Sequence, residues 1–299
     1  MRALVTGSDG FVGRWLCPHL REMGDEVIEV TMHDADITDG PAIAALIESG
    51  APDAIYHLAG LANVAESWVT PARTFEVNAT GTLHVLDAAR RMARRPTVLL
   101  VSSAEVYGIV TPEQLPIGED SPLRPVTPYA ASKVAAEYLG VQAHLGFELP
   151  VVRARPFNHV GPHQAAAFVV ADLARRIALA EQKGDRTLSV GNLTPRRDFT
   201  DVRDVVRAYR LLVAHDAAAG EVFNVCSGRA VSVGDLAARL LELAGANLEL
   251  VTDPDLVRAV DVPVLLGDNQ RLHAATGWSP QIDLDDTLKD VLAEARAAI

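Results

Sequence analysis

Cysteine is scarce in this chain, and its positive charges are outnumbered by negative ones. Only Cys17 and Cys226 occur among 299 residues, and they lie far apart in the sequence. Two isolated thiols do not form a disulfide framework or a metal-ligand cluster, so we expect reduced structural thiols and no metal site. The formal net charge of −12 argues against nucleic acid as a partner. A few local arginines can still bind an anionic ligand.

Long hydrophobic runs are missing as well. No segment approaches the 18 consecutive apolar residues of a membrane-spanning helix, and the N-terminal residues Met1–Thr6 pass directly into a strand-like run. We therefore expect neither a signal peptide nor a membrane span, and a cytoplasmic location. Hydrophobic residues make up 49% of the chain, which is enough to bury the core of a soluble globular protein.

What the first half does contain is an alternation of short apolar runs with helical patterns. The predicted strands are Ala3–Val5, Val27–Val30, Ala54–Leu58, Val98–Val101 and Pro150–Ala154. The predicted helices are Phe11–Met23, Pro41–Ser49, Pro71–Arg91 and Tyr129–Leu145. The strands are rich in Val, Ile and Leu without polar alternation, as parallel strands are when both faces of their sheet are covered. This order predicts an α/β fold with a doubly wound parallel sheet of the Rossmann type.

The second half is less regular and predicts a smaller α/β lobe. Its expected helices are Phe168–Gln182, Asp201–Ala214, Val233–Ala244 and Leu284–Ala298, and its expected strands are Leu188–Val190 and Val222–Val225. No long linker or repeat separates the halves. We predict one domain from residues 1–160 with about 198–226, and a C-terminal substrate lobe from about 161–197 and 227–299.

Three glycines follow the first strand in the pattern GxxGxxG. Gly7 permits a tight turn, Gly10 lets the backbone approach a pyrophosphate, and Gly13 allows close packing of helix on strand. The N–H groups at the start of the helix, including those of Phe11 and Val12, can then face phosphate oxygens. The loop therefore predicts a bound NAD or NADP.

Other expected cofactor contacts are less specific. The second strand ends at Val30–His33 without an acid or an arginine, so the sequence does not choose between NAD and NADP. Asp36 and Ile37 are candidates to bind the adenine amino group and cover its ring, and a helix-capping loop is the alternative for this segment. The small residues at the end of the third strand are expected to pass close to the cofactor ribose; they are Leu58, Ala59 and Gly60.

Tyr129 and Lys133 are the main chemical signal. Four residues apart on a helix, they share one face. A free tyrosine has a pKa near 10, and a nearby ammonium group stabilises its phenolate. Such a phenol can protonate a carbonyl oxygen during reduction or accept a proton during oxidation. The spacing is common on helices, but its position after a dinucleotide loop favours catalysis.

Polar residues near the fourth strand complete the candidate centre. Ser103 follows that strand, where side chains of this fold face the ligand crevice, and it is expected to hydrogen-bond the reacting oxygen. Ser102 is expected to be structural. Glu105 is a further candidate acid or base. Asn78 either remains a satisfied core amide or supports the site from behind.

The glycine loop, Ser103, Tyr129 and Lys133, in this order, resemble the extended short-chain dehydrogenase/reductase family along essentially the whole chain. The resemblance implies a Rossmann lobe with a sugar-nucleotide lobe, nucleoside-diphosphate sugar substrates and NAD(P) as cofactor. It gives Ser103, Tyr129 and Lys133 catalytic roles, with Lys133 also holding the nicotinamide ribose, and it adds Pro156 to the cofactor contacts. The family's interface helices, matched by 71–91 and 129–145, imply a homodimer.

Arginines in the second half match the family's phosphate-binding positions. The segment Arg153–Gln164 resembles the passage into the sugar-nucleotide site, where Asn158 is expected to contact the sugar or its phosphates. Arg197, in an Arg-Asp-Phe stretch, and Arg258 resemble the family's diphosphate ligands, a task that suits the planar guanidinium. Their neighbours Arg196 and Arg203 are expected to be solvated surface charges.

Three features resemble the branch of the family that reduces the C4 keto group of a GDP-4-keto-6-deoxy sugar to GDP-rhamnose or its C4 epimer. These are the short loop after the second strand, the stretch from Arg155 to Gln164 and the segment Phe223–Gly228. Glu105 keeps a 4,6-dehydratase or another sugar-nucleotide epimerase or dehydratase open, because dehydration needs a carboxylate to remove the C5 proton. A non-catalytic dinucleotide sensor should have lost Tyr129 and Lys133.

Overall fold

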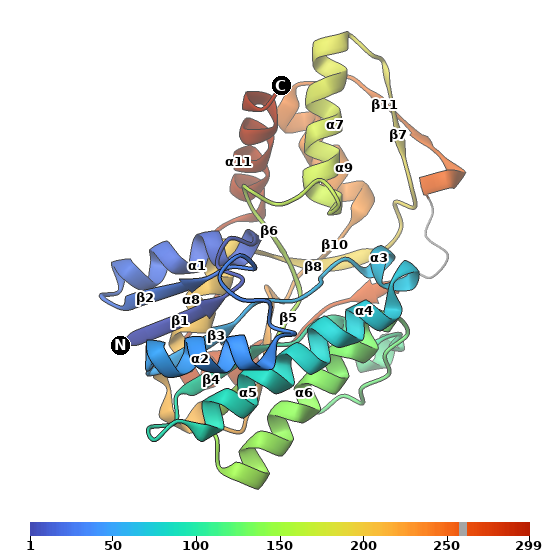
Figure 1. Ribbon diagram of the computed structural model, residues 1–299. Helices are drawn as coiled ribbons and strands as arrows, with labels where there is room; N and C mark the ends of the chain where they lie inside the picture. The colour runs from blue at the N-terminus through green and yellow to red at the C-terminus, as the bar shows by residue number, and fades with distance from the viewer. Residues whose placement is uncertain (257–261) are drawn as a thin grey trace.

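A parallel six-stranded sheet forms the centre of the protein (Figure 1). The computed structural model describes residues 1–256 and 262–299, so the predicted phosphate ligand Arg258 lies outside the described residues. The sheet order is β2-β1-β3-β4-β5-β9. Its strands are β1 (Arg2–Thr6), β2 (Glu26–Val30), β3 (Ala54–His57), β4 (Thr97–Val101), β5 (Val151–Pro156) and β9 (Val222–Val225).

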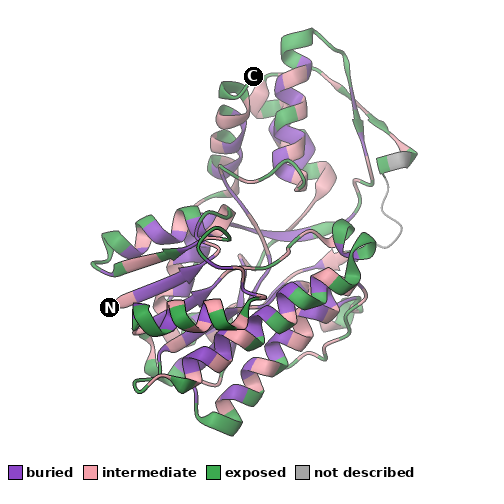
Figure 2. Cartoon of the chain, viewed as in Figure 1, coloured by how far each residue is buried: buried purple, intermediate pink, exposed green. Residues whose placement is uncertain are grey.

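Helices cover both faces of this sheet. One face is covered by α1 (Phe11–Glu22) and α8 (Val202–Ala214), the other by α2 (Gly40–Gly50), α5 (Gly81–Arg91) and α6 (Pro128–Phe147). All strands of the sheet except the edge strand β2 are accordingly buried for most of their length, between layers whose outer surfaces are exposed (Figure 2). The predicted doubly wound α/β fold is confirmed. No helix in the described part of the chain has the length and apolar character needed to span a membrane.

The strand order locates the crevice of the fold. The chain passes from β1 outward to β2 and then returns to β3 on the other side of β1. In open α/β sheets a ligand crevice forms at such a reversal, outside the carboxyl ends of the strands. The loops that follow β1, β3, β4 and β5 therefore meet at one edge of the sheet.

A second group of elements packs above that edge (Figure 1). Helices α7 (Val169–Lys183), α9 (Val233–Ala244) and α11 (Leu284–Ala297) share a core with the parallel strands β7 (Thr187–Val190) and β11 (Glu249–Thr252). A small sheet lies between this core and the large one, with β8 paired to three strands. Its strands are β6 (Asn158–Val160), β8 (Arg196–Asp201), β10 (Ala230–Ser232) and β12 (Val264–Leu265).

The proposed division into two domains stays a prediction. One detail differs from it, because part of the range 227–299 packs on the large sheet. Leu272 of α10 (Gln270–Thr276) and the buried Trp278 lie in the same core as α1 and α8. The final segment of the chain thus contacts the large lobe before it enters α11.

The predicted helix Pro71–Arg91 is interrupted. It consists of α4 (Pro71–Phe75), a π-helical turn at Glu76–Thr80 and α5. Asn78 lies in this turn. Such turns are frequent at functional sites, because the extra residue in the turn redirects side chains. The short helix before it, α3 (Val64–Val69), was not predicted.

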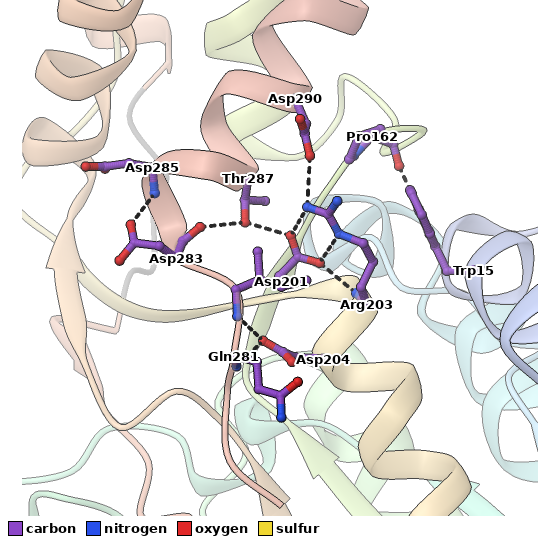
Figure 3. A network of polar contacts seen from close by, with 11 residues as sticks. Trp15, Pro162, Asp201, Arg203, Asp204, Gln281, Asp283, Asp285, Thr287 and Asp290 are labelled. Carbon is purple, nitrogen blue, oxygen red and sulfur yellow. Dashed lines mark hydrogen bonds and ion pairs between the residues drawn. The ribbon is translucent and has the colours of Figure 1, made fainter.

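A buried carboxylate joins α8 to α11 (Figure 3). Asp201 caps α8 and accepts hydrogen bonds from the backbone N–H and Nε of Arg203, at 2.7 and 2.9 Å, and from Thr287 Oγ1 on α11, at 2.6 Å. Arg203 also donates to Asp290 at 2.9 Å. The expectation that Arg203 is a solvated surface charge is therefore wrong, because its guanidinium lies between two acids from different helices.

Candidate active site

A cavity of about 740 Å³ lies at the carboxyl ends of the central strands and extends toward α7. Most residues selected from the sequence line it. They are Gly7, Gly10, Phe11, Val12, Gly13, Leu58, Gly60, Ser103, Glu105, Tyr129, Lys133, Pro156, Asn158 and Arg197. Asp36, Ile37 and Ala59 are not among its lining residues. The fold therefore brings the glycine loop, the catalytic candidates and two of the three substrate candidates to one space.

The glycine loop depends on its glycines for steric reasons. Gly7 has a φ of +69°, and a Cβ on it would lie 2.9 Å from the backbone nitrogen of Ala59. A Cβ on Gly13 would lie 2.5 Å from the carbonyl oxygen of Gly7, so a side chain there would separate α1 from β1. Helix α1 begins at Phe11 without a side-chain cap and without an acid in its first turn. Its first N–H groups are thus suited to bind an anion.

Asp36 and Ile37 both have contacts within the protein itself. Asp36 accepts hydrogen bonds from the backbone N–H and hydroxyl of Thr38 at 2.9 and 2.8 Å, and these bonds lower the pKa of its carboxyl group. The side chain of Ile37 is buried, and it packs against the backbone of Gly81 on α5. This side chain therefore lies in the core rather than in a position to cover an adenine ring.

Tyr129 is held in place by two hydroxyl groups at the start of α6. Thr127 caps the helix by accepting from the N–H of Ala130 at 3.0 Å. Ser67, buried on α3, accepts from the N–H of Tyr129 at 3.2 Å. Ser67 was not predicted as part of the site. Asn63 is the sequence signal for the helix that carries it, since its side chain accepts from two N–H groups of the first turn of α3.

The Tyr129 phenol is a protonated acid at neutral pH. Its pKa is raised to about 12, mainly by burial; a hydrogen bond with the Ser103 side chain opposes this shift, and the Glu105 carboxylate adds to it. Ser103 also accepts from the backbone N–H of Glu105 at 3.2 Å, which fixes the two residues relative to each other. A phenol in this state can donate a proton but holds it until a strong base forms nearby.

Lys133 does not have the expected effect on the phenol. Its Nζ donates to the carbonyl oxygen of Val101 at 3.0 Å, and burial lowers the pKa of the ammonium to about 8. The expectation was that this charge lowers the pKa of Tyr129. The net shift of the phenol is instead upward, with burial as its largest cause, and Lys133 is not among the groups that shift it.

Asn78 combines both roles considered for it. Its amide oxygen accepts from the N–H of Leu61 at 2.8 Å, and its nitrogen donates to the carbonyl of Leu61 at 3.0 Å and to Ser132 Oγ at 2.9 Å. The amide is thus fully used in the core. It also holds the chain after β3 beside α6, where a Cβ on Gly60 would lie 3.5 Å from Lys133 Nζ.

The polar residues beyond the catalytic candidates come from β6 and β8. Asn158 lies on β6, next to His159, whose ring stacks on Phe11 of the glycine loop. Arg197 lines the cavity and donates to the carbonyl of Val262 at 2.6 Å. Arg196 is exposed and donates to the carbonyl of Ala230, as expected for alternation along a strand.

These features define an extended short-chain dehydrogenase/reductase, as the sequence resemblance indicated. More narrowly, the chain belongs to the GDP-mannose 4,6 dehydratase family, whose model matches residues 28–291. It is 39% identical to a GDP-6-deoxy-D-mannose reductase of Pseudomonas aeruginosa over 98% of this chain and 96% of that protein.

Solved structures agree with this assignment. The structure of RMD from Pseudomonas aeruginosa complexed with NADPH matches with a TM-score of 0.91 and 37% identity, and the match covers 100% of both chains. A UDP-glucose 4-epimerase of Thermus thermophilus in complex with NAD matches with a TM-score of 0.88 and 29% identity, again over 100% of both chains. Proteins named for different nucleotides therefore share this fold.

Proposed function

We propose that this protein uses NADPH or NADH to reduce the C4 keto group of a GDP-4-keto-6-deoxy sugar, giving GDP-rhamnose or its C4 epimer. The observation that carries the proposal is the placement of Tyr129, a buried phenol that hydrogen-bonds Ser103 and lines one cavity with Lys133 and the glycine loop. Such a group is a proton donor, which reduction requires. The reductase named for the P. aeruginosa relative performs chemistry of this class.

The residues present fit a dinucleotide cofactor. The tight turn at Gly7 and the uncapped start of α1 would hold the pyrophosphate through the N–H groups of Phe11 and Val12. The ribose and nicotinamide would lie against residues around the catalytic centre: Leu58, Gly60, Lys133 and Pro156. When bound, the reduced nicotinamide supplies a hydride to the C4 carbon. The P. aeruginosa structure named with NADPH favours NADP.

The side chains of the catalytic centre orient the C4 oxygen and supply its proton. Ser103 orients the C4 oxygen, and Tyr129 donates its proton to that oxygen as negative charge develops there. An alkoxide is a stronger base than a phenolate, even one whose pKa is raised to about 12, so the transfer is favourable at that moment. Lys133, held by the Val101 carbonyl, positions the ribose hydroxyls of the cofactor.

The substrate would extend from this centre along β6 and β8. Asn158 would contact the sugar or its phosphates, and the buried guanidinium of Arg197 would bind the diphosphate. The strand that carries Arg197 is fixed by Asp198, which accepts from the N–H and hydroxyl of Ser227 at 2.7 and 2.6 Å. Arg258 stays a predicted second phosphate ligand.

Glu105 supports a second candidate, the 4,6-dehydration of GDP-mannose. Its carboxylate lies near enough to Tyr129 to raise the pKa of the phenol, and it lines the same cavity. A dehydratase needs a carboxylate in such a position to remove the C5 proton. In a reductase the same carboxylate keeps Tyr129 protonated.

A direct assay separates the two. The purified protein is incubated with GDP-4-keto-6-deoxymannose and NADPH, and cofactor oxidation is followed by absorbance while the sugar product is identified by mass spectrometry and NMR. We expect NADPH oxidation with formation of a GDP-6-deoxyhexose. Absence of cofactor oxidation would contradict the reductase. Formation of a 4-keto sugar from GDP-mannose without added reductant would instead support the dehydratase.

We also propose a cytoplasmic homodimer. Apolar side chains are exposed on α5 and α6, the helices that match the family's interface; they are Leu83, Tyr138, Leu145 and Phe147. Pairing two copies along these helices would bury them. The free, buried thiols Cys17 and Cys226 suit a reducing compartment. Light scattering during size-exclusion chromatography tests the dimer, and a monomer at micromolar concentration would contradict it.

A further inference from the structure

The cavity continues past Arg197 to an end built from α7, β7 and the loop after β7. Its walls there are apolar, formed by Leu173, Val190 and Leu193, and two opposite charges lie on α7 at Asp172 and Arg176. The order of groups along the cavity determines what this end can hold. If the reacting sugar lies at Tyr129 and the diphosphate at Arg197, the nucleoside base must lie at the α7 end.

Asp172 and Arg176 are held side by side, one helical turn apart. Arg176 Nη1 donates to Asp172 Oδ2 at 3.2 Å, and Arg176 Nη2 donates to the carbonyl of Ser189 on β7. Within the described residues the second carboxylate oxygen of Asp172 has no hydrogen-bond partner. The pair is partly exposed, with 38% of the Asp172 side chain and 25% of the Arg176 side chain accessible. An acceptor and a donor thus lie side by side at the cavity surface.

We infer that Asp172 and Arg176 select guanine as the base of the substrate, an inference that rests on the proposed function. Guanine has two N–H donors, at N1 and the 2-amino group, next to the acceptors O6 and N7. The Asp172 carboxylate matches the donors, and the Arg176 guanidinium matches the acceptors. Apolar residues such as Leu173 and Val190 can cover the ring faces.

Other bases present the wrong pattern to this pair. Adenine has an acceptor at N1, which the carboxylate of Asp172 would repel, and a 6-amino donor where guanine has O6. Uracil has one N–H between two carbonyl oxygens, so one oxygen must face the carboxylate. Because a UDP-glucose 4-epimerase shares this fold, side chains rather than the fold must make the choice.

Inosine diphosphate provides a sharp test, since it differs from GDP only by the missing 2-amino group. We would measure the affinities for GDP, inosine diphosphate and UDP by calorimetry, using the full chain and its Asp172→Ala variant. A carboxylate that accepts from the 2-amino group should give GDP an advantage of about tenfold over inosine diphosphate. In Asp172→Ala this ratio should fall to about twofold or less.

Asp185→Ala serves as the matched control, because Asp185 is an exposed acid just after the end of α7. It should keep the ratio of the unmodified chain. The inference is overturned if Asp172→Ala retains the full preference for GDP, or if the unmodified chain binds UDP as tightly as GDP. The base preference and the reductase assay are independent readouts. GDP selectivity without ketone reduction would refute the proposed function and leave the base selection intact.

Discussion

The hydroxyl of Ser67 accepts a hydrogen bond from the backbone N–H of Tyr129, at 3.2 Å, and so ties the short helix α3 to the first turn of α6. The first N–H groups of a helix have no partner within it. Ser67 satisfies one of them and also donates to the Val64 carbonyl at 2.6 Å, which fixes its own rotamer. The catalytic candidate Tyr129 is therefore positioned from a segment 62 residues earlier in the chain.

Replacing Ser67 by alanine should lower kcat by roughly three- to tenfold, because the buried N–H of Tyr129 loses its partner at a cost of about 1 kcal/mol. KM for the keto sugar should change little, since Ser67 is not among the lining residues of the cavity. Steady-state kinetics with NADPH measures both constants. Ser49→Ala is the control, because Ser49 donates to the Leu46 carbonyl on the exposed side of α2. An unchanged kcat in Ser67→Ala would show that Thr127 alone orients the tyrosine.

Glu105→Gln distinguishes the roles of the carboxylate. The Glu105 charge raises the pKa of Tyr129, so its removal should leave a phenol that is still protonated at pH 7. We expect ketone reduction to remain within about tenfold of the unmodified rate. Any dehydration of GDP-mannose should fall by roughly 100-fold or more, because it loses its base. Parallel assays of the two reactions on one preparation make the comparison, and a collapse of both would contradict a purely electrostatic role in reduction.

The pH dependence of kcat/KM should reflect the titration of Lys133 rather than that of Tyr129. Burial lowers the pKa of Lys133 to about 8 and raises that of Tyr129 to about 12. As pH rises through about 8, the lysine loses the charge that positions the cofactor ribose, so kcat/KM for reduction should decline there. Lys133→Arg keeps its charge at every accessible pH. Its profile should be flat between pH 7 and pH 9 even if its rate is lower, and a retained decline would assign the titration to another group.

The Asp201 carboxylate, which joins α8 to α11, should contribute more to the free energy of unfolding than the exposed charges at this junction. Asp201→Asn removes the ion pair with Arg203 and leaves buried donors without an anionic acceptor. We expect a loss of roughly 2 kcal/mol in the free energy of unfolding, less than for a fully buried pair, because 33% of the Arg203 side chain is exposed. Asp285→Asn on α11 breaks an exposed pair with Arg239 and should cost less than about 1 kcal/mol. Urea denaturation of both variants tests the difference, and equal losses would contradict it.

The sequence predicted the central sheet well, because its strands are continuous apolar runs between periodic helices. The prediction failed for segments in which polar residues are buried within a strand or a short helix. The run Arg196–Asp201 resembles a loop in composition, yet it forms β8, because Asp198 finds four donors in neighbouring loops. Helix α3 is too short and too polar to show periodicity. Neither case could be predicted without knowing the partners supplied by tertiary contacts.

The chemical residues of the site were found by type and spacing, but their electrostatics were not. Tyr129 and Lys133 lie in the expected cavity. The direction of the tyrosine pKa shift depends on how much water the fold removes from around the phenol, which no local pattern encodes. Likewise the Asp36-Ile37 pair matched a cofactor contact by position, and only the packing of Ile37 on Gly81 revealed a core side chain.

The π-helical turn Glu76–Thr80 constrains how this chain can change in length. Each residue advances an α-helix by about 100°, and a π turn holds one residue more than the turn it replaces. Deleting one residue between Thr74 and Gly81 would restore an unbroken helix, but it would also swing Asn78 away from Leu61. Substitutions are tolerable at exposed positions of this stretch such as Glu76, whereas single deletions are not. Functional homologues of this protein should therefore differ in the exposed residues of this segment while preserving its length.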